Sequence, residues 1–309
     1  MAHIYIYSPS GAVRDKAAFR RGVRRLVALG HEVETDECAL QRHQRFAGDD
    51  AQRLAAIGRA AASGADIALI TRGGYGIHRL LPELPYKAIG RSIDKGTQWV
   101  GLSDFTTMQL AILAKTGHRT WAGPAVGEDF GAEGEADDIM LACFDDLIQG
   151  HGEGTGWSLP TADRRWLAAR SPEQPSVRVR GGVLWGGNLC VLTSLLGTPY
   201  FPDIRGGVLF LEDVHEHPYR IERMLMQLLL AGVLQRQKAI CLGQFNRFTL
   251  GPHDRGFNMG EVVKRIREKC KVPVLTGLPF GHVATKVMLP VGQKVDLLAE
   301  KDSALIYWG

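Results

Sequence analysis

The chain has 309 residues, of which 45% are hydrophobic, 23% charged and 8% aromatic. This composition excludes a disordered, collagen-like or disulfide-stapled protein and leaves enough apolar side chains for one large domain or two. Lys and Arg total 37 against 33 Asp and Glu, a formal net charge of +4, and neither sign gathers in long runs. We therefore expect no nucleic-acid-binding stripe.

Strand-like and helix-like segments alternate through the first 150 residues. Strands are predicted at His3–Tyr7, His31–Glu34, Ile67–Thr71 and Trp99–Leu102. Helices are predicted at Lys16–Leu29, Asp49–Ala62 and Asp104–Lys115. This alternation predicts an α/β domain with a mostly parallel sheet and helices on both faces.

Residues 151–176 are rich in Gly, Pro, Ser and scattered charge, which predicts an interdomain linker. Further strands are predicted at Val177–Trp185, Val208–Leu211, Ala239–Leu242 and Val272–Leu275. Further helices are predicted at Leu189–Leu196, Arg220–Ala231 and Gly260–Lys269. We therefore expect two α/β domains, at residues 1–150 and 177–309.

The cysteines and the N-terminal segment bear on the cellular compartment. Five cysteines at wide, irregular spacing match neither a disulfide framework nor a zinc site. Cys190 and Cys241 lie in apolar stretches, where a reduced cysteine behaves as a small hydrophobic residue. The sequence shows no signal-peptide pattern and no run of ~18 apolar residues. We expect a cytoplasmic protein without a membrane span.

Ser103 lies between a predicted strand and a predicted helix, in Gly101-Leu-Ser-Asp-Phe105. A serine at such a turn projects its hydroxyl beside the N–H groups of the helix start, as in a nucleophile elbow. Phe105 stands where the G-x-S-x-G pattern has its second glycine. On this fragment alone a helix N-cap is the simpler interpretation, because Ser and Asp cap helices whatever their function.

A serine nucleophile needs a base, and the base needs an acid that orients it. His282 follows the strand at Val272–Leu275, among glycines, and Glu212 and Asp213 end the strand at Val208–Leu211. A carboxylate in that place also has a simpler interpretation, as strand termination or a cap. The position of all these residues after strand ends favours a site, because open α/β sheets bind ligands there.

Two glycine-rich turns and a histidine pair leave alternatives open. Arg72–Gly76 has three glycines in four positions and follows a strand. It is a plain turn or a loop that presents N–H groups to an anion, and Trp185–Leu189 is a second such turn, which opens the helix predicted at Leu189–Leu196. His215-x-His217 specifies no third metal ligand, and Pro218 after it favours a helix start. We therefore predict no metal site.

Several motifs occur together in one order along nearly the whole chain. They are Ser8-Pro-Ser10, Arg72-Gly-Gly-Tyr-Gly76, Gly101-Leu-Ser-Asp104, Gly186-Gly-Asn-Leu189, Leu211-Glu-Asp213 before Tyr219-Arg-Ile221, and Gly277-Leu-Pro-Phe-Gly-His282. The ordered set resembles the LD-carboxypeptidase family of serine peptidases. The resemblance implies an N-terminal flavodoxin-like domain, related to class I amidotransferase folds, and a smaller C-terminal β/α domain, with the active site between the two.

The resemblance also implies a Ser–His–Glu triad. Ser103 would be the nucleophile, His282 the base and Glu212 the orienting acid. The oxyanion donors of the family correspond to the backbone N–H groups of Gly74 and Asp104. This implication decides between the cap and the elbow in favour of the elbow.

We expect further substrate contacts from Arg72, Tyr75, Ser8 and Asn188, with Arg72 as the candidate for binding a terminal carboxylate. Glu222 stands where the family pattern has Asp, and the carboxylate remains. The implied activity is removal of the terminal D-alanine from murein tetrapeptides during peptidoglycan recycling. The partner would be a muropeptide, no metal or organic cofactor is required, and the family favours homodimers.

Two other functions stay open. The microcin C immunity peptidases of the same family cleave an aminoacyl–nucleotide conjugate, although this chain length leaves little room for an extra nucleotide-recognition loop. A non-catalytic ligand-binding module could retain the same fold. The intact set of Ser103, Glu212 and His282 argues against a pure binding module, which does not need all three.

Overall fold

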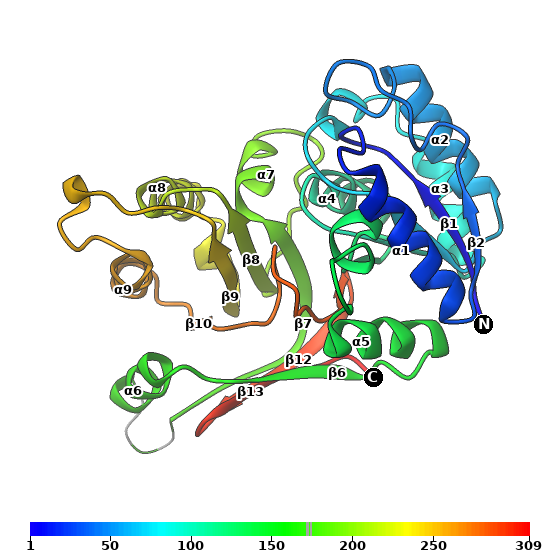
Figure 1. Cartoon of the computed structure of the whole chain (residues 1–309). Coiled ribbons are helices and arrows are strands. Elements are labelled where there is room, and N and C mark those ends of the chain that lie inside the picture. Colours follow the sequence, from blue (N-terminus) through cyan, green and yellow to red (C-terminus); the bar gives the residue numbers. More distant parts are fainter. Residues whose placement is uncertain (171–172, 174) are drawn as a thin grey trace. The chain divides into compact units, whose positions relative to one another are not determined.

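The computed structural model describes residues 1–170, 173 and 175–309, which form two compact units (Figure 1). The first unit comprises Met1–His151, Gly197–Pro202 and Ala284–Gly292. The second comprises Gly152–Leu196, Asp203–Val283 and Gln293–Gly309. Both units combine helices with a sheet, which confirms the predicted α/β fold class. The chain passes from one unit to the other more than once.

Among the described residues, the first unit contains a six-stranded sheet in the order β11-β5-β4-β3-β1-β2. The strands are β1 (His3–Tyr7), β2 (Glu32–Thr35), β3 (Ile67–Ile70), β4 (Gln98–Gly101), β5 (Thr120–Ala122) and β11 (Leu289–Val291). All neighbours run parallel except β11, which pairs antiparallel with β5. The inner strand β3 is buried throughout, which explains its continuously apolar sequence.

Helices pack against this sheet in two groups. The helix α1 (Lys16–Ala28) packs against β2 and the π-helical turn η2 (Val126–Phe130), whereas α2 (Asp50–Ala62), α3 (Tyr86–Asp94) and α4 (Phe105–Thr116) pack in succession. The predicted helices near α1, α2 and α4 are confirmed. The helix α3 and the helix α5 (Asp138–Gln149) were not predicted, and α3 follows directly on a proline-containing segment that indicates a turn.

The strand order places three of the sequence motifs at one edge of the first sheet. In the order 2-1-3-4-5, the chain reverses direction across the sheet between β1 and β3, and ligands bind beyond the carboxyl ends of strands at such a point. Ser8 follows β1, Arg72 follows β3 and Ser103 follows β4. The topology thus brings three separate motifs of the sequence to one edge of the first sheet.

The second unit contains a seven-stranded sheet among its described residues, in the order β10-β9-β8-β7-β12-β13-β6. The strands are β6 (Gly154–Ser158), β7 (Ser176–Asn188), β8 (Val208–Val214), β9 (Ala239–Asn246), β10 (Val274–Thr276), β12 (Lys294–Glu300) and β13 (Ser303–Tyr307). The strands β7 to β10 run parallel, and β12, β13 and β6 join them antiparallel. The long β7 pairs with β12 at its beginning and with β8 at its end.

The prediction of a linker at residues 151–176 needs correction. Most of this segment forms the edge strand β6 and the helix α6 (Thr161–Arg170), and both belong to the second unit. Residues 171, 172 and 174 of the predicted linker lie outside the described residues. The glycine-rich β6 has weak strand propensity and is held by pairing with β13 at the far end of the chain, so the local sequence does not reveal it.

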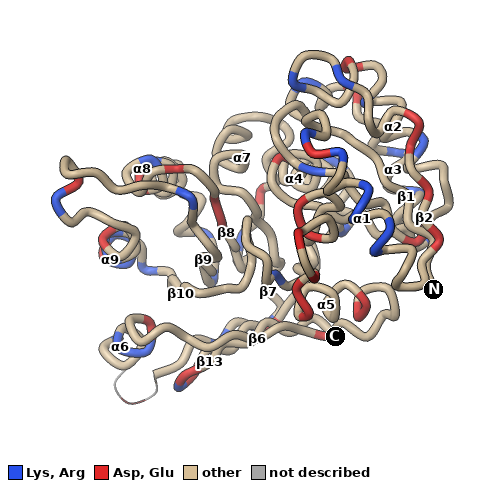
Figure 2. The backbone as a smooth tube through the Cα atoms, viewed as in Figure 1, with Lys and Arg blue, Asp and Glu red and all other residues tan. Residues whose placement is uncertain are grey.

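Three helices of the second unit, α7 (Leu189–Ser194), α8 (Pro218–Leu230) and α9 (Met259–Lys269), confirm the helices predicted there. His217 is the N-cap of α8 and Pro218 its first residue, which confirms the helix-start interpretation of this segment. Acidic and basic residues are interspersed in both units (Figure 2). Within the described part of the chain, no helix is both long and apolar enough to span a bilayer.

Candidate active site

Ser103 lies at the sharp turn between β4 and α4, where its backbone adopts a left-handed φ of 65°. The side chain is partly exposed, whereas Leu102 and Asp104 on either side are buried. Asp104 is the N-cap of α4, yet its carboxylate makes no cap hydrogen bond. Asp104 therefore occupies the N-cap position without capping the helix through its side chain, and the positive φ of Ser103 marks a strained turn of the kind that a nucleophile elbow requires.

Gly73 provides the space that Ser103 occupies. A Cβ placed on Gly73 would lie 2.4 Å from the Ser103 Cβ and 2.6 Å from its Oγ. Real Cβ atoms do not approach other heavy atoms so closely, so only glycine leaves the serine hydroxyl in this position. The close approach links the loop after β3 to the nucleophile elbow after β4.

We expect Gly73→Ala to lower kcat/KM by about 100-fold for any reaction that uses the Ser103 hydroxyl. The added methyl must displace either Ser103 or the loop after β3 that carries Gly73. The overpacking should also lower the free energy of unfolding by about 1–3 kcal/mol. Gly58→Ala is the matched control, because its Cβ would meet nothing within 4 Å inside the helix α2. Steady-state kinetics and thermal unfolding of both variants check the prediction, and wild-type kinetics for Gly73→Ala would contradict it.

The carboxylate of Asp104 fixes the loops around the serine. Its Oδ2 accepts hydrogen bonds from the Ser10 hydroxyl at 2.7 Å and from the Ile77 N–H at 3.0 Å. Burial raises its pKa, and these hydrogen bonds oppose the rise. The supporting role of Ser10 was not predicted, because its partner lies 94 positions away and no local pattern indicates the contact.

Two backbone donors lie close to the elbow. Gly74 is exposed, with a φ of 119°, and Asp104 begins the first turn of α4. Within the described chain, neither the Gly74 N–H nor the Asp104 N–H has a hydrogen-bond acceptor. Unpaired N–H groups at a helix start are suited to stabilising negative charge.

Arg72 lies half-buried beside the same glycine loop. A Cβ on Gly11 would lie 2.2 Å from its Nη1, and one on Gly74 would lie 2.9 Å from it. Burial lowers the pKa of the guanidinium, and the charge of Glu128 opposes this. The guanidinium makes no hydrogen bond or ion pair with any described residue, which is costly for a partly buried cation and points to an anionic ligand.

The other two predicted substrate contacts in the first unit differ in exposure. Tyr75 is 43% exposed, with its ring stacked on His78, so it is available to a ligand. Ser8 is 2% exposed, and its hydroxyl bonds to the Ala39 carbonyl and the Thr71 hydroxyl. The Ser8 hydroxyl is therefore held by partners within the first unit, and its contact with substrate stays a prediction.

In the second unit, Glu212 and His282 form a buried pair at the carboxyl end of β8. The Glu212 Oε2 lies 2.8 Å from the His282 Nδ1, and the two side chains are 0% and 8% exposed. The His282 carbonyl accepts a hydrogen bond from the Asn246 side chain at 3.0 Å. A carboxylate at Nδ1 fixes the imidazole tautomer with its basic nitrogen at Nε2.

Asn188 donates a hydrogen bond to the other oxygen of Glu212 and also to Asp213. The Asn188 Nδ2 lies 3.1 Å from Glu212 Oε1 and 3.0 Å from Asp213 Oδ1, and its Oδ1 caps α7 through the Val191 N–H. Asn188 is 5% exposed. Its amide holds two carboxylates, and substrate binding by Asn188 stays a prediction.

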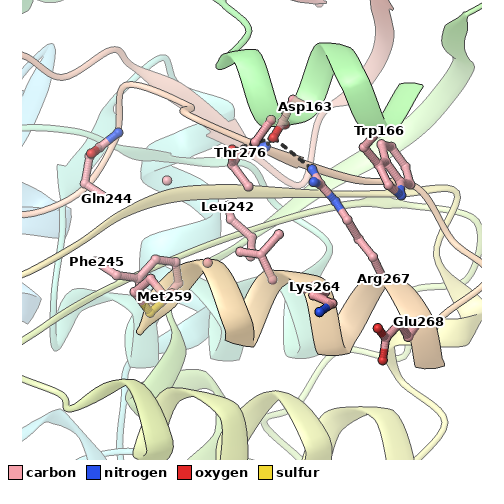
Figure 3. Close-up of a pocket in the computed structure, with 14 residues that line it drawn as sticks. Asp163, Trp166, Leu242, Gln244, Phe245, Met259, Lys264, Arg267, Glu268 and Thr276 are labelled. Atoms are coloured by element: carbon pink, nitrogen blue, oxygen red, sulfur yellow. Dashed lines mark hydrogen bonds and ion pairs between the residues drawn. The ribbon is translucent and has the colours of Figure 1, made fainter. Parts of the chain in front are cut away.

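The second unit also has a cavity of about 590 Å³ at the carboxyl ends of β9 and β10 (Figure 3). Leu242, Phe245 and Met259 form an apolar side, and Trp166 lies at the other end beside Arg267. The Arg267 guanidinium pairs with the buried Asp163 and lies 4.4 Å from the Trp166 ring. Neither Glu212 nor His282 lines this cavity, so it is distinct from the buried pair.

Comparison with known proteins finds family matches in both halves of the chain. Residues 4–123 match the model of the LD-carboxypeptidase N-terminal domain, and residues 181–297 match that of the C-terminal domain. The chain belongs to the LD-carboxypeptidase family. The family resemblance seen in the sequence motifs is thereby confirmed, and the protein is a member of a family of serine carboxypeptidases.

Two relatives of this LD-carboxypeptidase family member carry more specific names. The crystal structure of muramoyltetrapeptide carboxypeptidase from Oxalobacter formigenes is 38% identical, with a TM-score of 0.85 over 98% of this chain and 97% of that one. The microcin C7 self-immunity protein MccF of Escherichia coli is 31% identical over 242 residues, 73% of this chain and 69% of its own length. A structure of MccF in complex with glutamyl sulfamoyl guanosine has a TM-score of 0.84, with 25% identity over 99% of this chain and 95% of that one.

Proposed function

We propose that this protein is a serine LD-carboxypeptidase that removes the terminal D-alanine from murein tetrapeptides. Ser103, His282 and Glu212 act as nucleophile, base and orienting acid. Ser103 belongs to the first unit and the other two residues to the second, so catalysis requires the fold to bring the serine hydroxyl within hydrogen-bonding reach of His282 Nε2.

The buried Glu212–His282 hydrogen bond of 2.8 Å is the observation that carries this proposal. Burying a carboxylate and an imidazole together has a desolvation cost, and a ligand-binding module gains no function that offsets it. A catalytic base gains from the same contact, because the carboxylate stabilises the imidazolium that forms as the base takes a proton.

The reaction has two steps in this proposal. As the Ser103 hydroxyl attacks the carbonyl carbon of the L–D peptide bond, its proton passes to His282 Nε2. The oxyanion is stabilised by the N–H groups of Gly74 and Asp104. The C–N bond then breaks, and His282 gives the proton to the departing D-alanine amine. Water, deprotonated by the same imidazole, hydrolyses the acyl-enzyme and restores Ser103, so the mechanism needs no metal or organic cofactor.

Arg72 is the group we assign to the terminal carboxylate of the substrate. A carboxypeptidase must recognise a free carboxylate, and a guanidinium binds carboxylate with two parallel hydrogen bonds. The half-buried position of Arg72 beside Gly74, without a protein partner among the described residues, supports this assignment. Tyr75 offers an exposed ring to the rest of the peptide.

The test is release of D-alanine from a disaccharide-free tetrapeptide. We expect hydrolysis of the free acid and a loss of at least about 100-fold in kcat/KM for the peptide that ends in D-alaninamide, because the amide removes the charge that Arg72 would bind. A shortened peptide that already lacks D-alanine serves as the control. If the acid and the amide are cleaved equally well, the assignment of Arg72 fails.

The microcin-type alternative is supported by the likeness to MccF, which has been seen in complex with glutamyl sulfamoyl guanosine. Hydrolysis of an aminoacyl sulfamoyl adenosine, measured beside the tetrapeptide, separates the two substrates. Cleavage of the nucleotide conjugate alone would replace the murein proposal. Lack of cleavage of either, with no fluorophosphonate labelling of Ser103, would favour a non-catalytic module.

The cellular part of the proposal is a role in peptidoglycan recycling in the cytoplasm. The five cysteines are all free, which fits a reducing compartment. The homodimer stays a prediction from the family resemblance. Sedimentation analysis of the purified protein tests it, and a monomer at micromolar concentration would contradict it.

A further inference from the structure

Asp213 is a buried carboxylate that the proposed mechanism does not use. It is 3% exposed and directly follows Glu212, which is 0% exposed. The Asn188 amide bridges the two carboxylates, at 3.1 Å from Glu212 Oε1 and 3.0 Å from Asp213 Oδ1. Two neighbouring carboxylates out of water repel each other, so this arrangement is costly unless positive charge arises beside it.

The described residues provide one source of such charge. Glu212 pairs with His282, whose imidazole is positive only when it is protonated. Asp213 is held instead by neutral donors, namely the Cys190 N–H at 2.8 Å, the Val214 N–H at 2.8 Å and Asn188. The imidazolium that forms during catalysis would therefore contact Glu212, and the charge of Asp213 would act on it from beyond Asn188 and Glu212.

We propose that Asp213 is a positioning residue that, through Asn188, holds the Glu212 carboxylate in place and adds a second negative charge that favours the protonated form of His282. The inference rests on the proposed function, because it assigns His282 the role of base. It explains why the Asn188 amide faces inward and why an acid follows Glu212 at the end of β8.

The ionisation of Asp213 makes this charge dependent on pH. Burial, and next the charge of Glu212, raise the pKa of Asp213 to about 7, although the three kinds of hydrogen bond it accepts oppose the rise. Glu212 on β8 and, through it, His282 are the ionisable groups on its catalytic side. On the side of α7 lies Cys190, whose own surroundings include Glu216, Arg220 and Arg223. Above neutral pH Asp213 carries its charge, and below neutral pH it becomes neutral.

An ionised Asp213 stabilises the imidazolium, so His282 becomes protonated at a higher pH than it would beside Glu212 alone. As the pH falls, Asp213 takes up its own proton and this stabilisation fades, which spreads the imidazole titration over a wider range than one independent ionisation. In Asp213→Asn, the titration should be a single ionisation at lower pH.

The test combines kinetics with a titration that needs no turnover. For Asp213→Asn we expect the acidic limb of the kcat/KM profile to move to lower pH by roughly one pH unit, with KM for the tetrapeptide little changed. Asp36→Asn is the matched control, because Asp36 is equally buried at 3% and bonds to Tyr5 and Arg59 in the first unit. Asp36→Asn should lower the melting temperature without shifting the acidic limb of the kcat/KM profile.

The second measurement is an NMR titration of the His282 ring nitrogens in the wild-type protein, assigned with His282→Gln. A spread, two-step curve supports the proposal even if Asp213→Asn does not fold. A single ionisation in the wild type, or the same limb in wild type and Asp213→Asn, overturns it. Because the NMR readout is independent of hydrolysis, inactivity of the protein toward the tetrapeptide would refute the proposed function without deciding this inference.

Discussion

Ser103→Ala is expected to lower kcat/KM for the tetrapeptide by about 10⁴-fold or more, with KM changed little. The substitution removes the atom that forms the acyl-enzyme in the proposed mechanism and leaves the turn after β4 otherwise unchanged. Loss of a partly exposed hydroxyl that bonds to no described residue should change the free energy of unfolding by less than about 0.5 kcal/mol. Alanine at a left-handed φ is no more strained there than serine.

The experiment compares D-alanine release with fluorophosphonate labelling. Ser63→Ala is the matched control, since Ser63 is a helix-terminal serine of the same unit whose hydroxyl bonds only to its neighbours. The control should retain both activities. Hydrolysis that survives in Ser103→Ala would show that another group is the nucleophile, and the Ser–His–Glu mechanism would then have to be abandoned.

Glu212→Gln is expected to lower kcat by about 10³–10⁴-fold while the protein stays folded. The amide matches the volume of the carboxylate but cannot satisfy both of its neighbours. If its oxygen accepts from His282 Nδ1, its NH₂ group faces the Asn188 NH₂, and both are donors. Either Asn188 loses its acceptor, or the imidazole faces an NH₂ group that favours the other tautomer, and in both cases the imidazolium loses the negative charge beside it.

A matched control for this substitution is Glu300→Gln on β12, where an exposed carboxylate pairs with Arg178. Such surface pairs contribute about 0–1 kcal/mol, so kinetics and melting temperature should stay close to wild type. A kcat for Glu212→Gln within about tenfold of wild type would mean that the carboxylate does not orient the base. An unfolded Glu212→Gln protein would be identified by circular dichroism before any kinetic conclusion is drawn.

Local patterns predicted much of the fold correctly. Continuous apolar runs gave β1, β3, β4 and β8, because inner parallel strands are buried on both faces and need no polar alternation. Amphipathic spacing gave α8, with Ile221 and Met224 on its buried side. Glycines after β3 marked the loop at Arg72–Gly76, which the structure places at the carboxyl end of that strand. The turn predicted at Trp185–Leu189 was wrong, because residues 185–188 continue β7 and pair with β8, and Leu189 begins α7.

Segments stabilised by distant partners were missed. The strands β6, β12 and β13 form the antiparallel part of the second sheet, and β6 depends on pairing with residues near the end of the chain. The local sequence gives no information about the pairing of β6 with β13, so residues 151–176 were predicted to be a linker. The strand β11 was not predicted for the same reason. It lies between two segments of the second unit in the sequence but pairs with β5 in the sheet of the first unit.

The sequence by itself determined the family, the α/β class and the residues proposed as the triad, because an ordered set of motifs can be identified without knowing which residues are in contact. Only the tertiary structure decided the roles of their neighbours. It showed that Ser8 and Asn188 face inward, that Gly73 leaves room for Ser103, and that Asp213 shares the Asn188 amide with Glu212. Hydrogen bonds and close approaches depend on distances between residues far apart in the chain, and those distances exist only once the chain has folded.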